Sequence, residues 1–280
     1  MITSPITRPI TSRIASAIAG ARVGGGAWSP LTLFSGSEEG GYYDPSDLST
    51  LWQDAAGTVP VTTDGQTVNR IDDLSGNGLH LRSDTAGGVG SGVVYKGAGY
   101  LEATNDINDN EIRLGSGSSG SYIAMAVPMT IFCGVRGSTS GGAGSYEVIA
   151  VRGSDSSPST NMMRMARRGD VSRSDMRIRG SAAVPSVAQI TAVGSTNDMP
   201  SSSNLTIRAE FTSEAMEGYV GGVLGPSASH SWTTQSVTGS QVVLGAMGDE
   251  ARFYGGVVIN RLLTASEVEL MEAWLNARMA

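Results

Sequence analysis

Lysine, cysteine and aromatic residues are all scarce in this chain of 280 residues, and each shortage excludes a class of protein. Cys133 is the only cysteine, which excludes an internal disulfide and a zinc site built from several cysteines. Lys96 is the only lysine, so no glycine-rich tract ends in the Gly-Lys-Ser/Thr of a phosphate-binding loop. No apolar run approaches the roughly 20 residues of a membrane helix, which predicts that the chain does not insert into membranes.

Charged residues are also few, and the acidic ones outnumber the basic ones. They make up 16% of the chain, against roughly 25% in an average soluble domain. The formal net charge of -7 argues against a nucleic-acid partner, because binding to phosphates needs a surplus of cations. Aromatic residues make up only 6%, which predicts a core built mainly from alanine, valine, isoleucine, leucine and methionine.

Short apolar segments alternate with turn residues over most of the chain. The turns are marked by pairs such as Gly40-Gly41, Asp44-Pro45 and Asp64-Gly65. No helical stretch long enough for a crossover separates the apolar segments, which favours antiparallel pairing. The predicted fold is an all-β antiparallel sandwich, with strands over residues 93–95, 100–103, 123–127, 130–135, 147–151, 161–166, 175–179, 205–212, 215–223, 241–246 and 253–260.

Only the C-terminal segment has a clearly helical pattern. Residues 265–279 carry apolar side chains at helical spacing, and Thr264 with Glu267 has the spacing of a capping box. We expect this helix to close the open end of the sandwich. A single helical turn is also predicted over residues 47–53, with Ser46 as its cap.

The first 26 residues differ from the rest of the chain. Arginines interrupt every apolar stretch, so this segment is not expected to act as a secretory leader. Prolines favour an extended course over residues 1–10, and a short helix is predicted over residues 12–21. We expect residues 1–26 to form an arm that docks on another subunit, and residues 27–280 to form one domain. The alternatives for the arm are a frayed tail and an arm that folds back onto its own domain. The side chains expected to anchor the arm are Ile6, Ile10, Ile14 and Ile18.

The end of the chain carries an ordered series of motifs. Residues 242–246 read VVLGA, residues 252–261 read RFYGGVVINR, and Leu263, Thr264 and Glu267 follow. A strand that ends in glycine, an aromatic-glycine strand, an apolar strand and a Leu-Thr-x-x-Glu helix start occur in the same order in laminin-G-like, concanavalin A-like jelly rolls. The resemblance implies a jelly-roll form of the sandwich.

A second stretch, near the start of the domain, resembles a smaller group within these jelly-roll proteins. Residues 41–54 read GYYDPSDLSTLWQD, and residues 73–81 read DLSGNGLHL. This opening resembles the laminin-G-like proteins of tailed bacteriophages and prophages. The resemblance implies a virion structural protein, such as a tail, fibre or capsid-decorating appendage, that is made in the host cytoplasm, forms homo-oligomers and binds other virion proteins. It reaches residues 105–200 only through the rhythm of the strands.

Two further functions stay open: an adhesin that binds a host surface glycan, and an enzyme that degrades glycans. A glycan site needs an exposed aromatic ring beside amides or carboxylates. The segment 229–234 flanks one tryptophan with polar residues, and the candidate set is His230, Trp232, Asp249 and Glu250. The alternative is that Trp232 points into the core, as tryptophans commonly do. The other three tryptophans, Trp28, Trp52 and Trp274, are expected to be packing anchors.

Motifs for catalysis and metal binding are sparse. No strand carries the Glu-x-Asp-x-x-Glu run of glycosidases on this fold, so we expect no enzyme and no cofactor. The acidic run at 106–111 offers oxygen ligands that could hold calcium, namely Asp106, Asn108 and Asn110, with a solvated turn as the alternative. His80 has no nearby aspartate or cysteine at ligand spacing and is expected to be a strand residue with a satisfied hydrogen bond.

Overall fold

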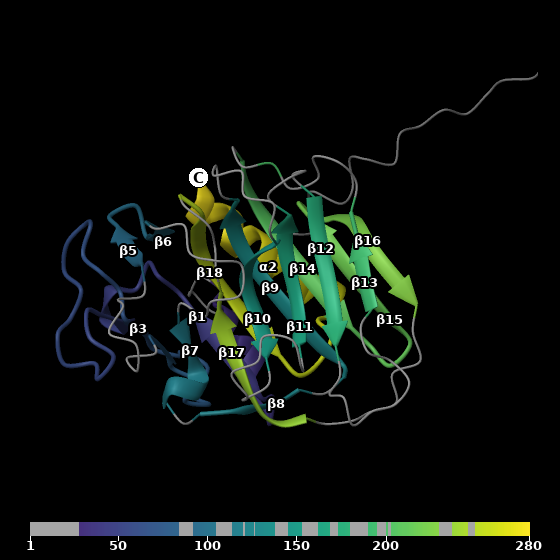
Figure 1. Cartoon of the computed structure of the whole chain (residues 1–280), viewed down its shortest axis with the longest axis horizontal. Helices are drawn as coiled ribbons and strands as arrows, with labels where there is room; N and C mark the ends of the chain where they lie inside the picture. The colour runs from purple at the N-terminus through teal and green to yellow at the C-terminus, as the bar shows by residue number, and fades with distance from the viewer. Residues whose placement is uncertain are drawn as a thin grey trace, which may run out of the picture.

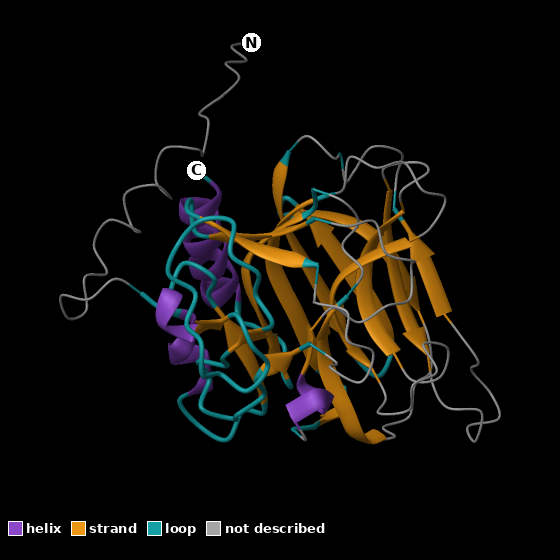
Figure 2. Ribbon diagram, turned by 60° about the vertical axis from the view of Figure 1, so that its left-hand side comes forward, coloured by secondary structure: helices purple, strands orange, loops and turns teal. Residues whose placement is uncertain are grey.

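Two antiparallel β-sheets pack face to face in the computed structural model of the chain (Figures 1 and 2). This arrangement confirms the predicted β-sandwich of the jelly-roll kind with a C-terminal helix. The structure describes residues 28–83, 92–104, 114–119, 121–125, 127–137, 145–152, 162–168, 173–179, 190–194, 200, 203–229, 237–245 and 250–280.

The first sheet has eight strands in the order β16-β15-β14-β9-β18-β6-β5, with β1 paired to β18 beside this path. Strand β9 lies in its middle, hydrogen-bonded to β14 on one side and to β18 on the other. The strands are β1 (Gly40–Tyr43), β5 (Val93–Lys96), β6 (Tyr100–Ala103), β9 (Met129–Arg136), β14 (Asn204–Phe211), β15 (Ala215–Val220), β16 (Val223–Ser229) and β18 (Arg252–Ile259).

The second sheet has ten strands in the order β13-β12-β11-β10-β17-β7-β4-β3-β2, with β8 paired to β17. Three very short strands at one end, β2, β3 and β4, come from the N-terminal third of the described chain. The strands are β2 (Leu51–Trp52), β3 (Arg70–Ile71), β4 (Leu81–Arg82), β7 (Leu114–Gly115), β8 (Ile123–Met125), β10 (Ser145–Arg152), β11 (Met162–Arg168), β12 (Arg173–Arg179), β13 (Ile190–Val193) and β17 (Val237–Leu244).

The main core lies between the two sheets and follows from alternation along each strand. In β9, Met129, Ile131, Cys133 and Val135 face this core, while Phe132 points to the opposite face of the sheet. The same rule places Leu51, Ile71 and Leu81 in the core, each of them fully buried, although their strands have only two residues. The outward neighbours of these three residues are therefore fixed on the outer face of the second sheet.

Helix α2 (Ala265–Met279) begins at Thr264, whose side chain forms the predicted capping box with Glu267. The prediction that this helix closes the open end of the sandwich is wrong. It lies against the outer face of the first sheet, near β9, β14 and β18 (Figure 1). The reason is an apolar outer surface that has to be covered; the buried cluster there consists of Leu33, Tyr42, Phe132, Val257, Ile259, Leu263, Met271, Trp274 and Leu275.

The described part of the chain also contains three short 3₁₀ helices: η2 (Pro30–Phe34), which precedes β1, η3 (Leu48–Thr50) and η5 (Ser116–Ser119). The expected helical turn over residues 47–53 is therefore shorter, and its cap is Asp47 instead of Ser46. Leu51 and Trp52 then continue the chain as strand β2, because the side chain of Leu51 enters the core. In the part of the chain that the structure describes, no helix is long and apolar enough to cross a membrane.

Candidate functional site

Five polar or aromatic side chains gather on the outer face of β2, β3 and β4. Backbone register aligns Trp52 with Arg70 and Arg70 with Arg82, so these three residues form a row across the strands. Because Ile71 and Leu81 point into the core, alternation places their neighbours Asp72 and His80 on the same outer face. We call the five residues the Trp52 cluster: Trp52, Arg70, Asp72, His80 and Arg82.

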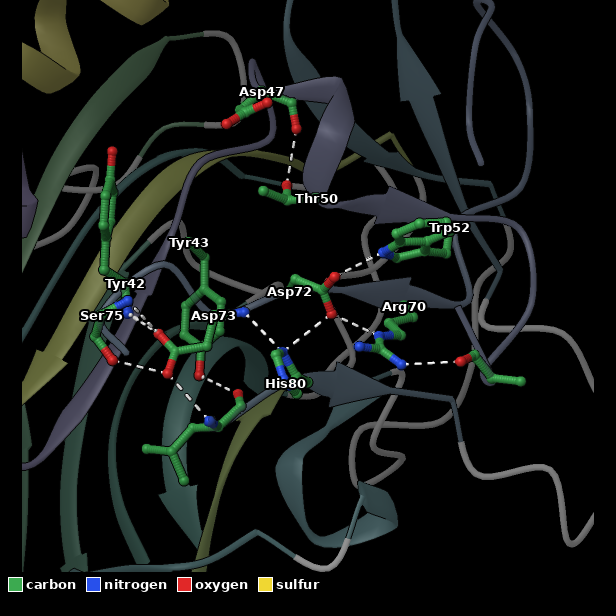
Figure 3. A network of polar contacts seen from close by, with 12 residues as sticks. Tyr42, Tyr43, Asp47, Thr50, Trp52, Arg70, Asp72, Asp73, Ser75 and His80 are labelled. Atoms are coloured by element: carbon green, nitrogen blue, oxygen red, sulfur yellow. Dashed lines mark hydrogen bonds and ion pairs between the residues drawn. The ribbon is translucent and has the colours of Figure 1, made fainter. Parts of the chain in front are cut away.

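The carboxylate of Asp72 is the centre of the cluster (Figure 3). Its Oδ2 accepts a hydrogen bond of 2.8 Å from the indole Nε1 of Trp52. Its Oδ1 accepts one of 2.5 Å from Nε of Arg70 and lies 3.0 Å from Nδ1 of His80. Because charge-assisted hydrogen bonds are short and directional, Asp72 fixes the orientation of the indole ring.

His80 lies between an acceptor and a donor. Its Nδ1 is 3.0 Å from Asp72 Oδ1, and the backbone N–H of Asp73 donates to the same nitrogen over 3.2 Å. With a proton on Nδ1 the ring donates to Asp72; without it the ring accepts from Asp73. The expected satisfied hydrogen bond is confirmed. The expected lack of a nearby aspartate is wrong, because the turn over residues 73–79 brings Asp72 and His80 together.

Arg70 attaches a neighbouring loop to the cluster. Its Nη1 donates to the backbone oxygen of Ala56 over 3.0 Å. Gly57 passes directly over the guanidinium with φ 78°, and a Cβ on this glycine would lie 2.7 Å from Nη1. Two nitrogens of the Arg70 guanidinium, Nε and Nη1, thus hold Asp72 and the loop, which gives Arg70 a positioning role.

Arg82 differs from Arg70 in having no hydrogen-bonded or ion-paired partner among the residues that the structure describes. Its Nε is buried and has no hydrogen-bond partner. Burial lowers the pKa of Arg82, the nearby Arg70 lowers it further, and Asp72 acts in the opposite direction. Its register partner on β7 is Gly115, which adds no side chain at this place in the row.

A second polar network, centred on Asp73, lies next to the Trp52 cluster. The buried carboxylate of Asp73 accepts hydrogen bonds from Tyr42 N, Ser75 N, Ser75 Oγ and Leu79 N, at 2.7 to 3.0 Å. The hydroxyl of Tyr43 donates to the oxygen of Leu79 over 2.8 Å (Figure 3). These contacts tie the turn 73–79 to β1, so this network is a structural one.

The outer face of the first sheet holds another set of charges, which sequence reasoning missed. Cross-strand register places Glu210 of β14 opposite Glu217 of β15. Arg208 lies 3.1 Å from Glu210 and 3.9 Å from the centre of the Tyr219 ring, and the hydroxyl of Tyr219 donates to Glu217 over 2.7 Å. Burial raises the pKa of Glu210. Each charged group in this set already has a partner within it.

Most of the predicted site residues lie outside the described part of the chain. This holds for His230, Trp232 and Asp249, for Asp106, Asn108 and Asn110, and for Ile6, Ile10, Ile14 and Ile18. Glu250 is described: it is exposed, adopts a left-handed φ of 59°, and its N–H donates to the oxygen of Ala103 over 2.9 Å. It shapes the turn that leads into β18. Among the described residues, no three histidine, cysteine or acidic side chains form a group that could hold a metal ion.

The sequence predicts Trp28, Trp52 and Trp274 to be packing anchors. Trp274 confirms this, with 8% of its surface exposed in the cluster under α2, and the partly buried Trp28 packs against the same cluster. Trp52 differs, because it is half-buried on the outer face of its sheet. Its position follows from strand register between segments that are distant in sequence, which no local pattern reveals.

Comparisons with known proteins find similar folds only. No family model matches the chain, and no curated protein matches it. The CBM40 module of a Ruminococcus gnavus IT-sialidase, bound to α2,3-sialyllactose, is 11% identical, covers 52% of this chain and 82% of its own, and gives a TM-score of 0.41. The binding domain of botulinum neurotoxin serotype D is 10% identical over 73% of this chain and 49% of its own, with a TM-score of 0.44. An endo-β-1,3-glucanase from Pyrococcus furiosus is 13% identical over 61% and 78%, with a TM-score of 0.39.

Proposed function

We propose that this chain is a carbohydrate-binding module and that the ligand binds at the Trp52 cluster. One observation carries the proposal: an outward-facing indole is fixed by a carboxylate, with a guanidinium and an imidazole beside it. Ligand sites combine apolar, aromatic surface with a few fixed polar groups that set orientation. A sugar presents both kinds of surface, since its C–H groups pack on aromatic rings and its hydroxyl groups bind polar side chains.

The cluster is built before any ligand arrives. Because Asp72 already accepts from the indole N–H, the ring needs no reorientation to present its apolar surface. Arg70 and Gly57 fix the loop beside it, and β2, β3 and β4 carry the row on regular backbone. Such preorganisation reduces the entropy lost on binding, and sites on strands are positioned more firmly than sites on loops.

The experiment measures glycan binding by the full chain and by two variants. Trp52→Ala removes the ring and should weaken binding about 10- to 100-fold, the range for an aromatic group at the centre of an interface. Tyr219→Ala truncates an aromatic residue on the outer face of the other sheet and should leave the affinity unchanged. Failure of the intact protein to retain any glycan on an array would refute the proposal, as would full affinity in a folded Trp52→Ala variant.

The setting of this binding is a separate part of the proposal. The sequence resemblance to phage laminin-G-like proteins supports display on a virion, as an adhesin that contacts a host glycan. Residues 1–26 would then anchor the domain to other virion proteins, and the assembly would be homo-oligomeric. Deletion of residues 1–26 should abolish incorporation into particles while glycan binding persists. Unchanged incorporation would contradict the anchoring role.

We propose binding without hydrolysis. Glu210 and Glu217 face each other across two strands, but Arg208 and Tyr219 already hold them. A glycosidase needs one carboxyl group to protonate the leaving oxygen and another to act as nucleophile or base. Release of reducing sugar from a polysaccharide that the protein binds, lost on Glu217→Gln, would contradict this part of the proposal.

A further inference from the structure

We propose that Arg82 makes the site selective for sugars that carry a carboxylate. This inference rests on the proposed function, because it assigns the class of glycan that binds at the Trp52 cluster. Two observations carry it: the place of Arg82 in the row, and the lack of an anionic partner for its guanidinium among the described residues.

Arg82 and Trp52 lie on the same face with one strand between them. The register runs from Trp52 on β2 through Arg70 on β3 to Arg82 on β4. With strands about 4.8 Å apart, the two outer positions are roughly 10 Å apart along the row. A ligand that packs a sugar ring on the indole can therefore reach the guanidinium with a substituent or with a second ring.

The charges of the cluster do not cancel. Asp72 is engaged by the indole of Trp52 and by the guanidinium of Arg70, and His80 lies at its Oδ1. With a neutral imidazole, the two arginines and one aspartate leave a surplus of one positive charge, in a chain whose net charge is -7. Arg82 carries this surplus, since Arg70 is already paired.

Protein covers the Nε of Arg82, so a ligand would contact the guanidinium through its Nη atoms. An anion there also offsets the unfavourable burial of this cationic group. Burial and the repulsion from Arg70 lower the pKa of Arg82, and a bound anion would act in the opposite direction. A carboxylate matches a guanidinium in a planar, two-point contact. A carboxylated sugar supplies both that group and the ring for Trp52.

The experiment compares matched ligands by titration calorimetry. Oligogalacturonate is tested against its methyl ester, and α2,3-sialyllactose against lactose. In each pair only the first member carries a free carboxylate. The two pairs represent the two common classes of carboxylated sugar, uronic acids and sialic acids. We expect the full chain to prefer the charged member of at least one pair by about 10- to 100-fold, the factor for one charge-assisted contact. The preference should decrease as salt is added.

Three variants test the assignment to Arg82. Arg82→Gln should abolish the preference for the charged member of the pair. Arg82→Lys should keep part of it, because the charge remains and the planar fork is lost. Lys96→Gln is the matched control, since its ammonium is paired with Glu102 on the first sheet, and it should behave as the unmodified chain.

The outcomes separate this inference from the proposed function. If Arg82→Gln keeps the preference, or if the intact chain binds both members of each pair equally, the selectivity is overturned and carbohydrate binding stands. Stronger binding of a sulfated than of a carboxylated oligosaccharide would overturn the assignment to a carboxylate. If neither pair nor any arrayed glycan binds, carbohydrate binding itself is refuted, and the inference with it.

Discussion

Buried aspartates stabilise a fold only if each oxygen accepts hydrogen bonds, because desolvation of a carboxylate is costly. Asp73 fulfils this condition: Oδ1 accepts from Tyr42 N and Ser75 N, and Oδ2 from Ser75 Oγ and Leu79 N. Two segments that are distant in sequence are joined at a single side chain in this way. The turn that presents His80 depends on it.

Asp73→Asn should therefore be strongly destabilising. An amide offers one accepting oxygen, and its NH₂ group would face two backbone or hydroxyl donors. We expect a loss of about 2–4 kcal/mol in the free energy of unfolding, measured by urea denaturation.

Asp47→Asn is the matched control for this change. Asp47 caps η3 and accepts from Ser49, and asparagine caps a helix as well as aspartate does. This variant should lose less than about 0.5 kcal/mol. Equal losses in the two variants would mean that the four hydrogen bonds of Asp73 add little.

At the scale of residues, the sequence alone could predict part of the site. The stretch 73–81 stands out through its resemblance and its turn signals. His80 has the expected hydrogen bond, but it precedes β4 and is not itself a strand residue. The contact between His80 and Asp72 was missed, because a turn closes it, and so was the row through Trp52, which depends on pairing of β2, β3 and β4. Local spacing carries no information on such pairings.

At the scale of elements, helix α2 depends on two contacts with the first sheet. Trp274 packs over Gly255, whose φ is 126°. A Cβ at this glycine would lie 2.9 Å from Cη2 of Trp274 and 3.0 Å from the backbone oxygen of Tyr43. At the other contact, Arg278 binds Asp44 with its Nε and Nη2 and stacks on Trp274.

Gly255→Ala should lower the free energy of unfolding by about 2–4 kcal/mol, because backbone strain and overpacking act together. Gly65→Ala provides the comparison: its φ is 80°, and a Cβ at this glycine would meet nothing within 4 Å. Only the strain applies there, and the loss should be about 1 kcal/mol. Thermal melts of both variants decide the point, and similar losses would show that α2 can move away from β18.

The start of α2 makes the stability depend on pH. The hydrogen bond between Glu267 and Arg261 lowers the pKa of Glu267 to about 2, against an ordinary value of 4.5. The folded state therefore gains stability from the ionised carboxylate above pH 4.5, and this gain is lost as the pH falls towards 2. Because the pair is partly exposed, we expect about 1 kcal/mol. In Glu267→Gln this part of the decline between pH 4.5 and 2 should be absent; an unchanged curve would contradict the assignment.

The elements that the sequence predicts well are those with one buried face. Strands β9, β14 and β18 and helix α2 were expected close to their observed bounds, since their apolar periodicity is regular. Strand β16 was not expected; it contains Pro226, which an edge strand tolerates because one side of its backbone has no partner. Strand β1 was missed because its four residues, GGYY, are buried on both faces and show no alternation.

At the scale of the whole molecule, the sandwich has two different outer faces. Helix α2 covers the first sheet, and the Trp52 cluster lies on the outer face of the second sheet. The fold class follows from sequence because strand rhythm and turn residues are sufficient to specify an antiparallel sandwich. The sequence does not reveal which face the helix covers. That choice depends on apolar residues such as Phe132, which alternation places away from the core.

This separation predicts that stability and binding can be changed independently. Arg278→Gln leaves Asp44, with 7% of its side chain exposed, without its cationic partner, and should cost about 1–3 kcal/mol. Its affinity for glycan should not change, because α2 lies on the opposite side of the sandwich. Arg82→Gln should show the reverse profile: altered ligand preference with an unchanged or slightly raised melting temperature. A loss of binding in folded Arg278→Gln protein would contradict the independence of the two faces.

The central position of Cys133 has a practical consequence for chemical labelling. Its sulfur is fully buried in β9, where its backbone pairs with Ile207 of β14 and Gly256 of β18, and burial raises the pKa of its thiol. An alkylating reagent can reach it only after three neighbouring strands separate, which amounts to global opening. The rate of alkylation in native buffer therefore reports the population of unfolded chains. A variant whose free energy of unfolding falls by 2 kcal/mol should be alkylated roughly 30-fold faster. The alkylation rate of this single thiol therefore measures differences in stability between variants.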